Sequence, residues 1–161
     1  MTQSYTPLQI RLHWLIVALV ALQYILHDPI SDAFEMVEDG ASPGFSPLVA
    51  AHVFGGFLIF AATLIRFSVR LSHGAPHPPV AEPDPFRTIA HLAHWAFYGL
   101  LVLLPVSGAV AWFRASEIAA DVHEVLRALL LALIVLHVAG VLVHQFVWKT
   151  AILDRMRLRK S

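Results

Sequence analysis

Four long apolar stretches alternate with polar, proline-containing segments along the chain. We predict that they form helices over residues 8–27, 47–71, 86–113 and 121–148. Each reaches the roughly 20 residues that a helix needs to cross a lipid bilayer. Residues 28–46 and 72–85 contain several prolines and glycines and are expected to be loops, because proline disrupts helices. The pattern predicts an all-α membrane protein, a four-transmembrane-helix bundle.

The composition supports a membrane protein with one domain. Of 161 residues, 58% are hydrophobic and only 14% are charged, against about a quarter charged in a typical soluble domain. Four spans use up most of the length, so we expect a single domain over residues 1–161. The first apolar stretch contains a histidine and lacks a small-residue cleavage site after it, so we expect a spanning helix and not a signal peptide.

Basic and acidic residues gather at opposite ends of the predicted bundle. Nine of the eleven Lys and Arg residues lie on the side of the two termini. The other side holds eight acidic residues, with Arg114 and Arg127 as its basic residues. The excess of positive charge predicts that both termini are cytoplasmic. The basic C-terminal tail is expected to contact membrane lipid and not nucleic acid.

Histidine is the residue that carries candidate chemistry. The chain has ten histidines and no cysteine, which excludes disulfides, cysteine-ligated iron–sulfur clusters and c-type haem. Seven histidines lie within or at the ends of the predicted helices: His13, His52, His91, His94, His123, His137 and His144. Ionisable side chains in a bilayer usually face the bundle interior. Zinc sites often add carboxylates, which the spans nearly lack, so we expect haem.

The spacing in the last helix predicts two haems. His123 and His137 are 14 residues apart, so they lie within about 40° of one face and about 21 Å apart along the axis. His144 falls on the same stripe. One haem in each leaflet follows, with His13 and His52 supplying partners from other helices at opposite ends. Depth alone leaves two sets of pairs open. In one set His13 pairs with His137 and His52 with His123. In the other His13 pairs with His144 and His52 with His137.

Several short motifs resemble the bacterial cytochrome b561 family over nearly the whole chain. They are Tyr5-x-x-x-Gln9-Ile10-x-Leu12-His13-Trp14-Leu15, His52-x-x-Gly55, His91-x-x-His94, Leu104-Pro105-x-x-Gly108, and His123-Glu124 with His137, His144 and Trp148-Lys149. The resemblance implies a four-helix protein of the bacterial inner membrane that binds two haem b groups. It pairs His13 with His137 on the cytoplasmic side. It pairs His52 with His123 on the periplasmic side.

The resemblance also implies an activity. Small members of this family resemble superoxide oxidase, which passes electrons from periplasmic superoxide through two b haems to ubiquinone. On this interpretation His94 and His144 are candidates for quinone binding and proton transfer, because imidazole titrates near neutral pH. Arg127 and Arg114 are candidates to attract superoxide or to pair with a haem propionate. The family assigns no role to His27.

The charge of the predicted periplasmic side favours a second interpretation. An enzyme that oxidises an anion should present positive potential at its entrance, yet eight acidic residues lie on this side. The chain would then be a di-haem electron-transfer subunit that relays electrons between quinone and a basic periplasmic redox partner, such as a dehydrogenase or hydrogenase. A haem-free metal transporter or structural membrane protein is a third class, which an optical spectrum would recognise.

Overall fold

The computed structural model describes residues 5–74, 76, 84–150 and 152–157, and every element in them is helical. The elements are α1 (Pro7–Ile25), α2 (His27–Glu38), α3 (Pro47–His73), α4 (Asp84–Arg114) and α5 (Glu117–Leu142), then a π-helical turn (Val143–Val147) and a 3-10 helix (Ile152–Met156). Four helices are long and apolar enough to cross a membrane: α1, α3, α4, and α5 with its π-helical turn. The four predicted spans are therefore confirmed.

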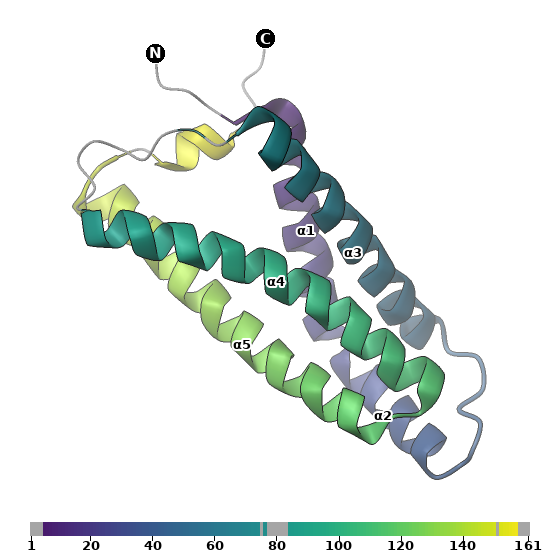
Figure 1. Ribbon diagram of the computed structural model, residues 1–161. Coiled ribbons are helices and arrows are strands. Elements are labelled where there is room, and N and C mark those ends of the chain that lie inside the picture. The colour runs from purple at the N-terminus through teal and green to yellow at the C-terminus, as the bar shows by residue number, and fades with distance from the viewer. Residues whose placement is uncertain (1–4, 75, 77–83, 151, 158–161) are drawn as a thin grey trace.

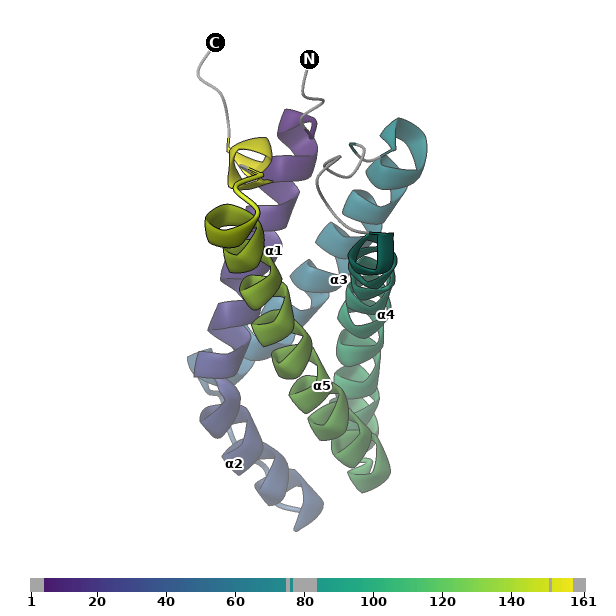
Figure 2. The same ribbon diagram turned by 90° about the vertical axis from the view of Figure 1, so that its left-hand side faces the viewer.

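The long helices form two antiparallel pairs. Helix α1 packs along α3, helix α4 packs along α5, and α3 joins the pairs by contacting α4 (Figures 1 and 2). The short helix α2 lies at one end of the bundle, which we call the α2 end. The start of α1 and the end of α5 lie at the opposite end, which we call the terminal end. There, the Trp14 Nε1–H donates to the carbonyl oxygen of Met156 at 3.0 Å.

Hydrogen bonds at the terminal end join the start of α1 to α3. The Thr6 hydroxyl accepts from the Gln9 backbone N–H at 3.2 Å, and the Gln9 side chain accepts from the Thr6 backbone N–H at 3.0 Å. This capping box satisfies N–H groups that the first helical turn leaves unpaired. The Gln9 side-chain amide donates to the Gly74 carbonyl at 3.0 Å, and Arg66 Nη1 donates to the Gln9 carbonyl at 2.7 Å. Arg66 is thereby held at the level of the first turn of α1.

The outside of the bundle is apolar. The buried core is small and is formed by Leu12, Ile16, Val20, Ile59, Ala62, Leu101, Leu104 and Leu130. Large apolar side chains instead point outward: Ile118 on α5 is 78% exposed and Leu136 is 69% exposed. Such a surface is unfavourable in water and is what a helix bundle presents to lipid.

The prediction that residues 28–46 form a loop is wrong, because α2 occupies residues 27–38. Pro29 is the third residue of α2, where no backbone N–H is needed for an intrahelical hydrogen bond. The helix is amphipathic: Ala33 is buried, while Asp32 and Glu35 are exposed. The other residues that suggested a loop, Gly40, Pro43 and Gly44, all lie after Glu38.

The predicted connections at residues 72–85 and 114–120 are shorter than expected. Helix α3 continues to His73, and Pro85 lies in the first turn of α4, where proline is tolerated. Residues 75 and 77–83 lie outside the described residues, as do Arg159 and Lys160 of the predicted basic tail. Helix α5 begins at Glu117 because the Ser116 side chain accepts from the Ala119 N–H. Only residues 115 and 116 connect α4 to α5.

Candidate haem-binding sites

A cavity at the α2 end is lined by side chains from all five α-helices. We call it the α2 cavity, and its lining includes His27, His52, His123, Glu124 and Arg127. Its volume is about 210 Å³, whereas a single water molecule needs roughly 10–15 Å³. The cavity is therefore large enough for a bound ligand.

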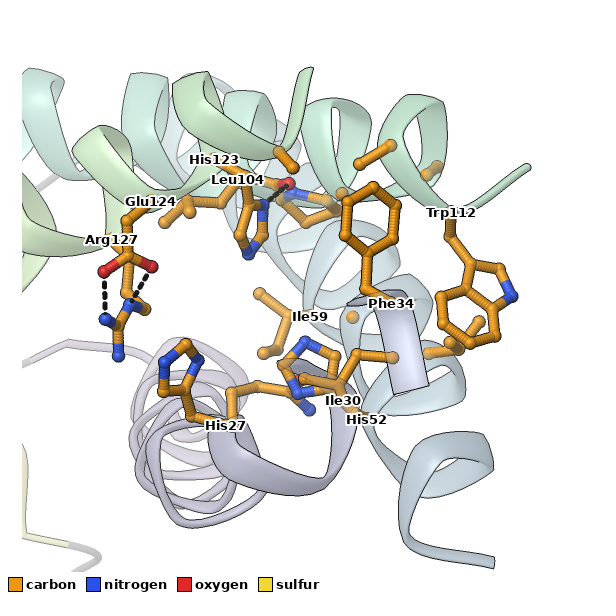
Figure 3. Close-up of a pocket in the computed structure, with 18 of the residues that line it drawn as sticks. His27, Ile30, Phe34, His52, Ile59, Leu104, Trp112, His123, Glu124 and Arg127 are labelled. Carbon is orange, nitrogen blue, oxygen red and sulfur yellow. Dashed lines mark hydrogen bonds and ion pairs between the residues drawn. The ribbon is translucent and has the colours of Figure 1, made fainter. Parts of the chain in front are cut away.

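Two imidazoles enter the α2 cavity from opposite sides. His52 comes from α3 and His123 from α5 (Figure 3), and the two interact electrostatically. The His123 Nδ1–H donates to the Leu104 carbonyl at 2.9 Å, which fixes the ring and leaves Nε2 for a ligand. His52 Nδ1 is buried with no hydrogen-bond partner among the described residues. Both rings therefore have a nitrogen available for a ligand in the cavity.

Three glycines near the α2 cavity differ in what surrounds the position of a Cβ atom. A Cβ atom at Gly108 would lie 3.0 Å from His123 Cε1, so the absence of a side chain lets this imidazole pack against α4. A Cβ atom at Gly55 would collide with the Gln23 amide, so Gly55 allows close approach of α1 to α3. Gly56 lines the cavity itself, with open space where its Cβ would lie. Of the two glycines after His52, Gly56 lines the cavity and Gly55 does not.

One edge of the α2 cavity is polar. The Arg127 Nε–H donates to a Glu124 carboxylate oxygen at 3.0 Å, and the two side chains form an ion pair. Tyr24 donates its hydroxyl hydrogen to the Arg127 carbonyl at 2.7 Å, which ties α1 to α5. His27 lies beside this pair, while Phe34 and an indole from α4 lie at the opposite edge (Figure 3). Arg114, the other predicted cation, is exposed at the end of α4 and outside the cavity lining.

A second group of imidazoles lies nearer the terminal end. We call His13, His94 and His137 the terminal histidine cluster; they come from α1, α4 and α5. His13 interacts electrostatically with both of the others. The rings of His94 and His137 are perpendicular, with centroids 5.9 Å apart. The His94 Nδ1–H donates to the Ala90 carbonyl at 2.6 Å, which leaves its Nε2 facing away from the helix backbone.

Sequence reasoning missed Arg66 as part of this cluster. Its guanidinium interacts electrostatically with His13, His94 and His137. In the sequence Arg66 counted only as a positive charge that indicates membrane orientation. The missed signal is its position 14 residues after His52 in the same helix, the spacing that separates His123 from His137.

The structure brings together the histidine pairs that the family resemblance implies. His13 lies near His137, and His52 lies near His123. His144 is buried in the π-helical turn, where its Nδ1 lies 2.9 Å from the Thr150 hydroxyl oxygen. This geometry favours His137 over His144 as the partner of His13. That these residues bind iron stays a prediction.

His91 is the remaining histidine of the predicted spans, and it is exposed. His91 is on the exposed face of α4 and accepts a hydrogen bond from Trp95 Nε1 at 2.9 Å.

Within the described part of the chain, no three His, Cys, Asp or Glu side chains lie close enough together to hold a metal ion directly. Two histidines that would hold one haem iron need not belong to such a group of three.

Comparison with known proteins gives the same family over nearly the whole chain. The model of the prokaryotic cytochrome b561 family matches residues 4–158. The chain is 32% identical to cytochrome b562 of Cereibacter sphaeroides, over 97% of this chain and 98% of that protein. It is 30% identical to the probable superoxide oxidase CybB of Yersinia pestis, over 99% of both chains. With its four apolar spans, the chain is a multi-pass bacterial inner-membrane protein and belongs to the prokaryotic cytochrome b561 family, whose members are haem b proteins of electron transfer.

Proposed function

We propose that this protein is a superoxide oxidase, which oxidises superoxide at the α2 end and reduces ubiquinone with the electrons. The observation that carries the proposal is the arrangement of two histidine pairs at two levels of the bundle. Full-length similarity to a probable superoxide oxidase supports the choice of substrate. The balanced reaction converts two superoxide ions, one ubiquinone and two protons into two dioxygen molecules and one ubiquinol.

The residues at both levels fit haem b. At the α2 cavity, His52 and His123 would hold the iron, because each has a free nitrogen and Gly56 leaves room beside them. At the terminal end, His13 and His137 would hold the second iron. When bound, the haems supply one-electron transfer between the two ends of the bundle. The protein supplies the ligands, their spacing and the surrounding charge.

The sides of the membrane follow from charge. The acidic residues of α2 and the basic residues of the terminal end support an orientation with the α2 end in the periplasm and both termini in the cytoplasm. Protons for ubiquinone reduction then come from the terminal end, where His94 and His144 are the candidate groups for quinone binding and proton transfer. His94 is the better placed of the two, because its ring centroid lies 5.9 Å from that of His137, a proposed haem ligand.

The charge at the α2 cavity shapes access by an anion. Arg127 is the cation on the cavity edge, and the Glu124 carboxylate holds its guanidinium in place. The ion pair offsets part of the charge that would attract superoxide. A bound propionate would compete for the same guanidinium. Arg127 therefore guides superoxide only over short distances.

The exposed face of α2 favours a second candidate function, electron exchange with a soluble periplasmic protein. This face carries five exposed acidic residues: Asp28, Asp32, Glu35, Glu38 and Asp39. A basic redox protein would be attracted to it, whereas superoxide would be repelled. Neutralising Asp32 and Glu35 together therefore separates the two functions. A faster reaction with superoxide supports the oxidase, and a slower reaction with a basic partner supports the relay.

The direct test is stopped-flow mixing of the purified, oxidised protein with superoxide. We expect the haem absorption to change to the reduced spectrum faster than superoxide disappears by its own dismutation, and ubiquinol to form when ubiquinone is present. Added superoxide dismutase should abolish both signals. Haems that stay oxidised in superoxide, but are reduced by a basic redox protein, would replace the oxidase with the relay.

A further inference from the structure

Two helices carry polar side chains at two levels, with the same spacing. Helix α3 has His52 and Arg66, and helix α5 has His123 and His137, each pair 14 residues apart. In a helix this spacing brings the two side chains within about 40° of one face, about 21 Å apart. His13 in α1 is likewise followed after 14 residues by His27, which lies just past the Leu26 cap and begins α2.

Helices α1 and α3 therefore exchange roles between the two levels. At the α2 cavity, α3 and α5 supply the pair His52 and His123, and the chain leaving α1 supplies His27 as a third polar group. At the terminal end, α1 and α5 supply the pair His13 and His137, and α3 supplies Arg66 as the third. Because α1 and α3 run in opposite directions, each one contributes a histidine of the proposed ligand pair near its start. The third group lies near the end of α3 for Arg66, and just past the end of α1 for His27.

The electrostatic interactions of the third groups are alike. His27 interacts electrostatically with both histidines of the α2 cavity. Arg66 interacts electrostatically with His13 and His137 in the terminal histidine cluster. Each third group thus lies near enough to both members of one pair to interact with their charge. Neither is needed as an axial ligand, since each pair already provides two imidazoles.

Both third groups lie on the side of their pair that faces the nearer end of the bundle. Arg66 donates to the carbonyl of Gln9, which lies one turn beyond His13 toward the terminal end. His27 follows the end of α1 and lies on the polar edge of the α2 cavity, beside Arg127 and Glu124. The aromatic edge of the cavity lies across from it (Figure 3). A ligand with one polar and one apolar edge would be oriented by this contrast.

We propose that His27 and Arg66 are equivalent carboxylate-binding residues, each holding the propionate edge of the haem bound by the adjacent histidine pair. The proposal rests on the haem ligation proposed above. Haem b has two propionates on one edge and apolar substituents on the others, which matches the polar and aromatic edges of the α2 cavity. A hydrogen bond or ion pair to a propionate offsets negative charge near the iron and so favours the reduced, less positive iron.

The test replaces each third group by an apolar residue of similar size and measures the reduction potential of each haem. In His27→Leu and Arg66→Met we expect both haems to be retained. The ratio of reduced to oxidised haem at a fixed potential should fall about threefold for one haem only, which for one electron is about 30 mV. The α2-cavity haem should respond to His27→Leu, and the terminal haem to Arg66→Met. The conservative variants His27→Gln and Arg66→Lys should keep the reduction potential of each haem close to the wild-type value.

Two backgrounds identify which haem responds. A His52→Leu protein should keep only the terminal haem, and a His13→Leu protein only the α2-cavity haem. The exposed residues His91 and Arg11 provide matched controls, His91→Leu and Arg11→Met, which should leave both potentials unchanged.

The outcomes separate the two proposals. If His52→Leu and His13→Leu leave haem content unchanged, the proposed ligation fails. If ligation holds but neither third-group variant moves a potential, or both move the same haem, only the equivalence of His27 and Arg66 is overturned. Loss of one haem in His27→Leu, together with loss of its bis-imidazole electron paramagnetic resonance signal, would make His27 a ligand and contradict the proposal as well.

Discussion

The two candidate haem sites are built from similar parts in different surroundings. The α2 cavity lies under an amphipathic helix with an acidic outer face, and its cation, Arg127, is paired with Glu124. The terminal histidine cluster has a third imidazole, His94, and the guanidinium of Arg66. This difference is what the proposed function requires, with electrons entering from an external donor at the α2 cavity and electron transfer coupled to protons at the terminal histidine cluster. Four predictions test that contrast.

The largest effect is expected from removing one proposed ligand at each level. His52→Leu and His137→Leu should each lower the ratio of haem to protein from two to one, because an iron that loses one of two axial imidazoles is held weakly. The pyridine haemochrome assay with a protein determination measures this ratio. Unchanged pigment in both variants would show that the ligands lie elsewhere.

A smaller but selective effect is expected at Gly108. The larger side chain of Gly108→Val would push His123 away from α4, since even a Cβ atom would lie 3.0 Å from the imidazole. Overpacking of this kind costs about 1–3 kcal/mol, and we expect partial loss of the α2-cavity haem with the terminal haem intact. Gly99→Val, in the same helix with open space at its Cβ, is the control. Equal haem loss in both variants would contradict a specific role for Gly108.

A rate effect is expected when the Arg127 guanidinium is released from its carboxylate. Glu124→Gln removes a negative charge at the edge of the α2 cavity, so superoxide should reduce the protein about two to three times faster at low ionic strength. Salt should reduce the gain, because the side chains are partly exposed and their charges are screened. Glu38→Gln, the same change at the far end of α2, should have a smaller effect. A slower reaction in Glu124→Gln would contradict electrostatic guidance at this edge.

The smallest effect is expected at Thr150. Thr150→Val removes the hydroxyl that contacts His144 Nδ1 at 2.9 Å. The free energy of unfolding should fall by about 0.5–1.5 kcal/mol, the net value of one hydrogen bond, and haem content should not change. Thermal unfolding in detergent measures the first and the optical spectrum the second. Loss of the terminal haem would instead favour pairing of His13 with His144.

The spans were predictable because lipid imposes a simple rule on sequence. About 20 apolar residues with polar flanks predict a spanning helix, and each predicted span corresponds to one long helix. Helix α2 was missed because Pro29 and the later glycines outweighed a helical pattern. The acidic residues Asp28, Asp32 and Glu35 are spaced by four and three residues, which is typical of one helix face.

The histidine pairs were predictable only in part. The spacing of His123 and His137 indicated two levels, but depth did not decide between His137 and His144 as the partner of His13. That decision depends on where α5 ends, and the π-helical turn with its contact to Thr150 directs His144 toward the chain end. Arg66 was missed because a basic residue near the end of a span also marks membrane orientation.

The central claim is that the bundle holds two cofactors, one at each histidine pair. The most direct measurement is the ratio of haem b to protein in the purified wild-type protein, with a potentiometric titration of the same sample. Two haems per chain that titrate as two one-electron steps are predicted. One haem per chain, or two that are both lost when only His52 is replaced, would contradict the claim.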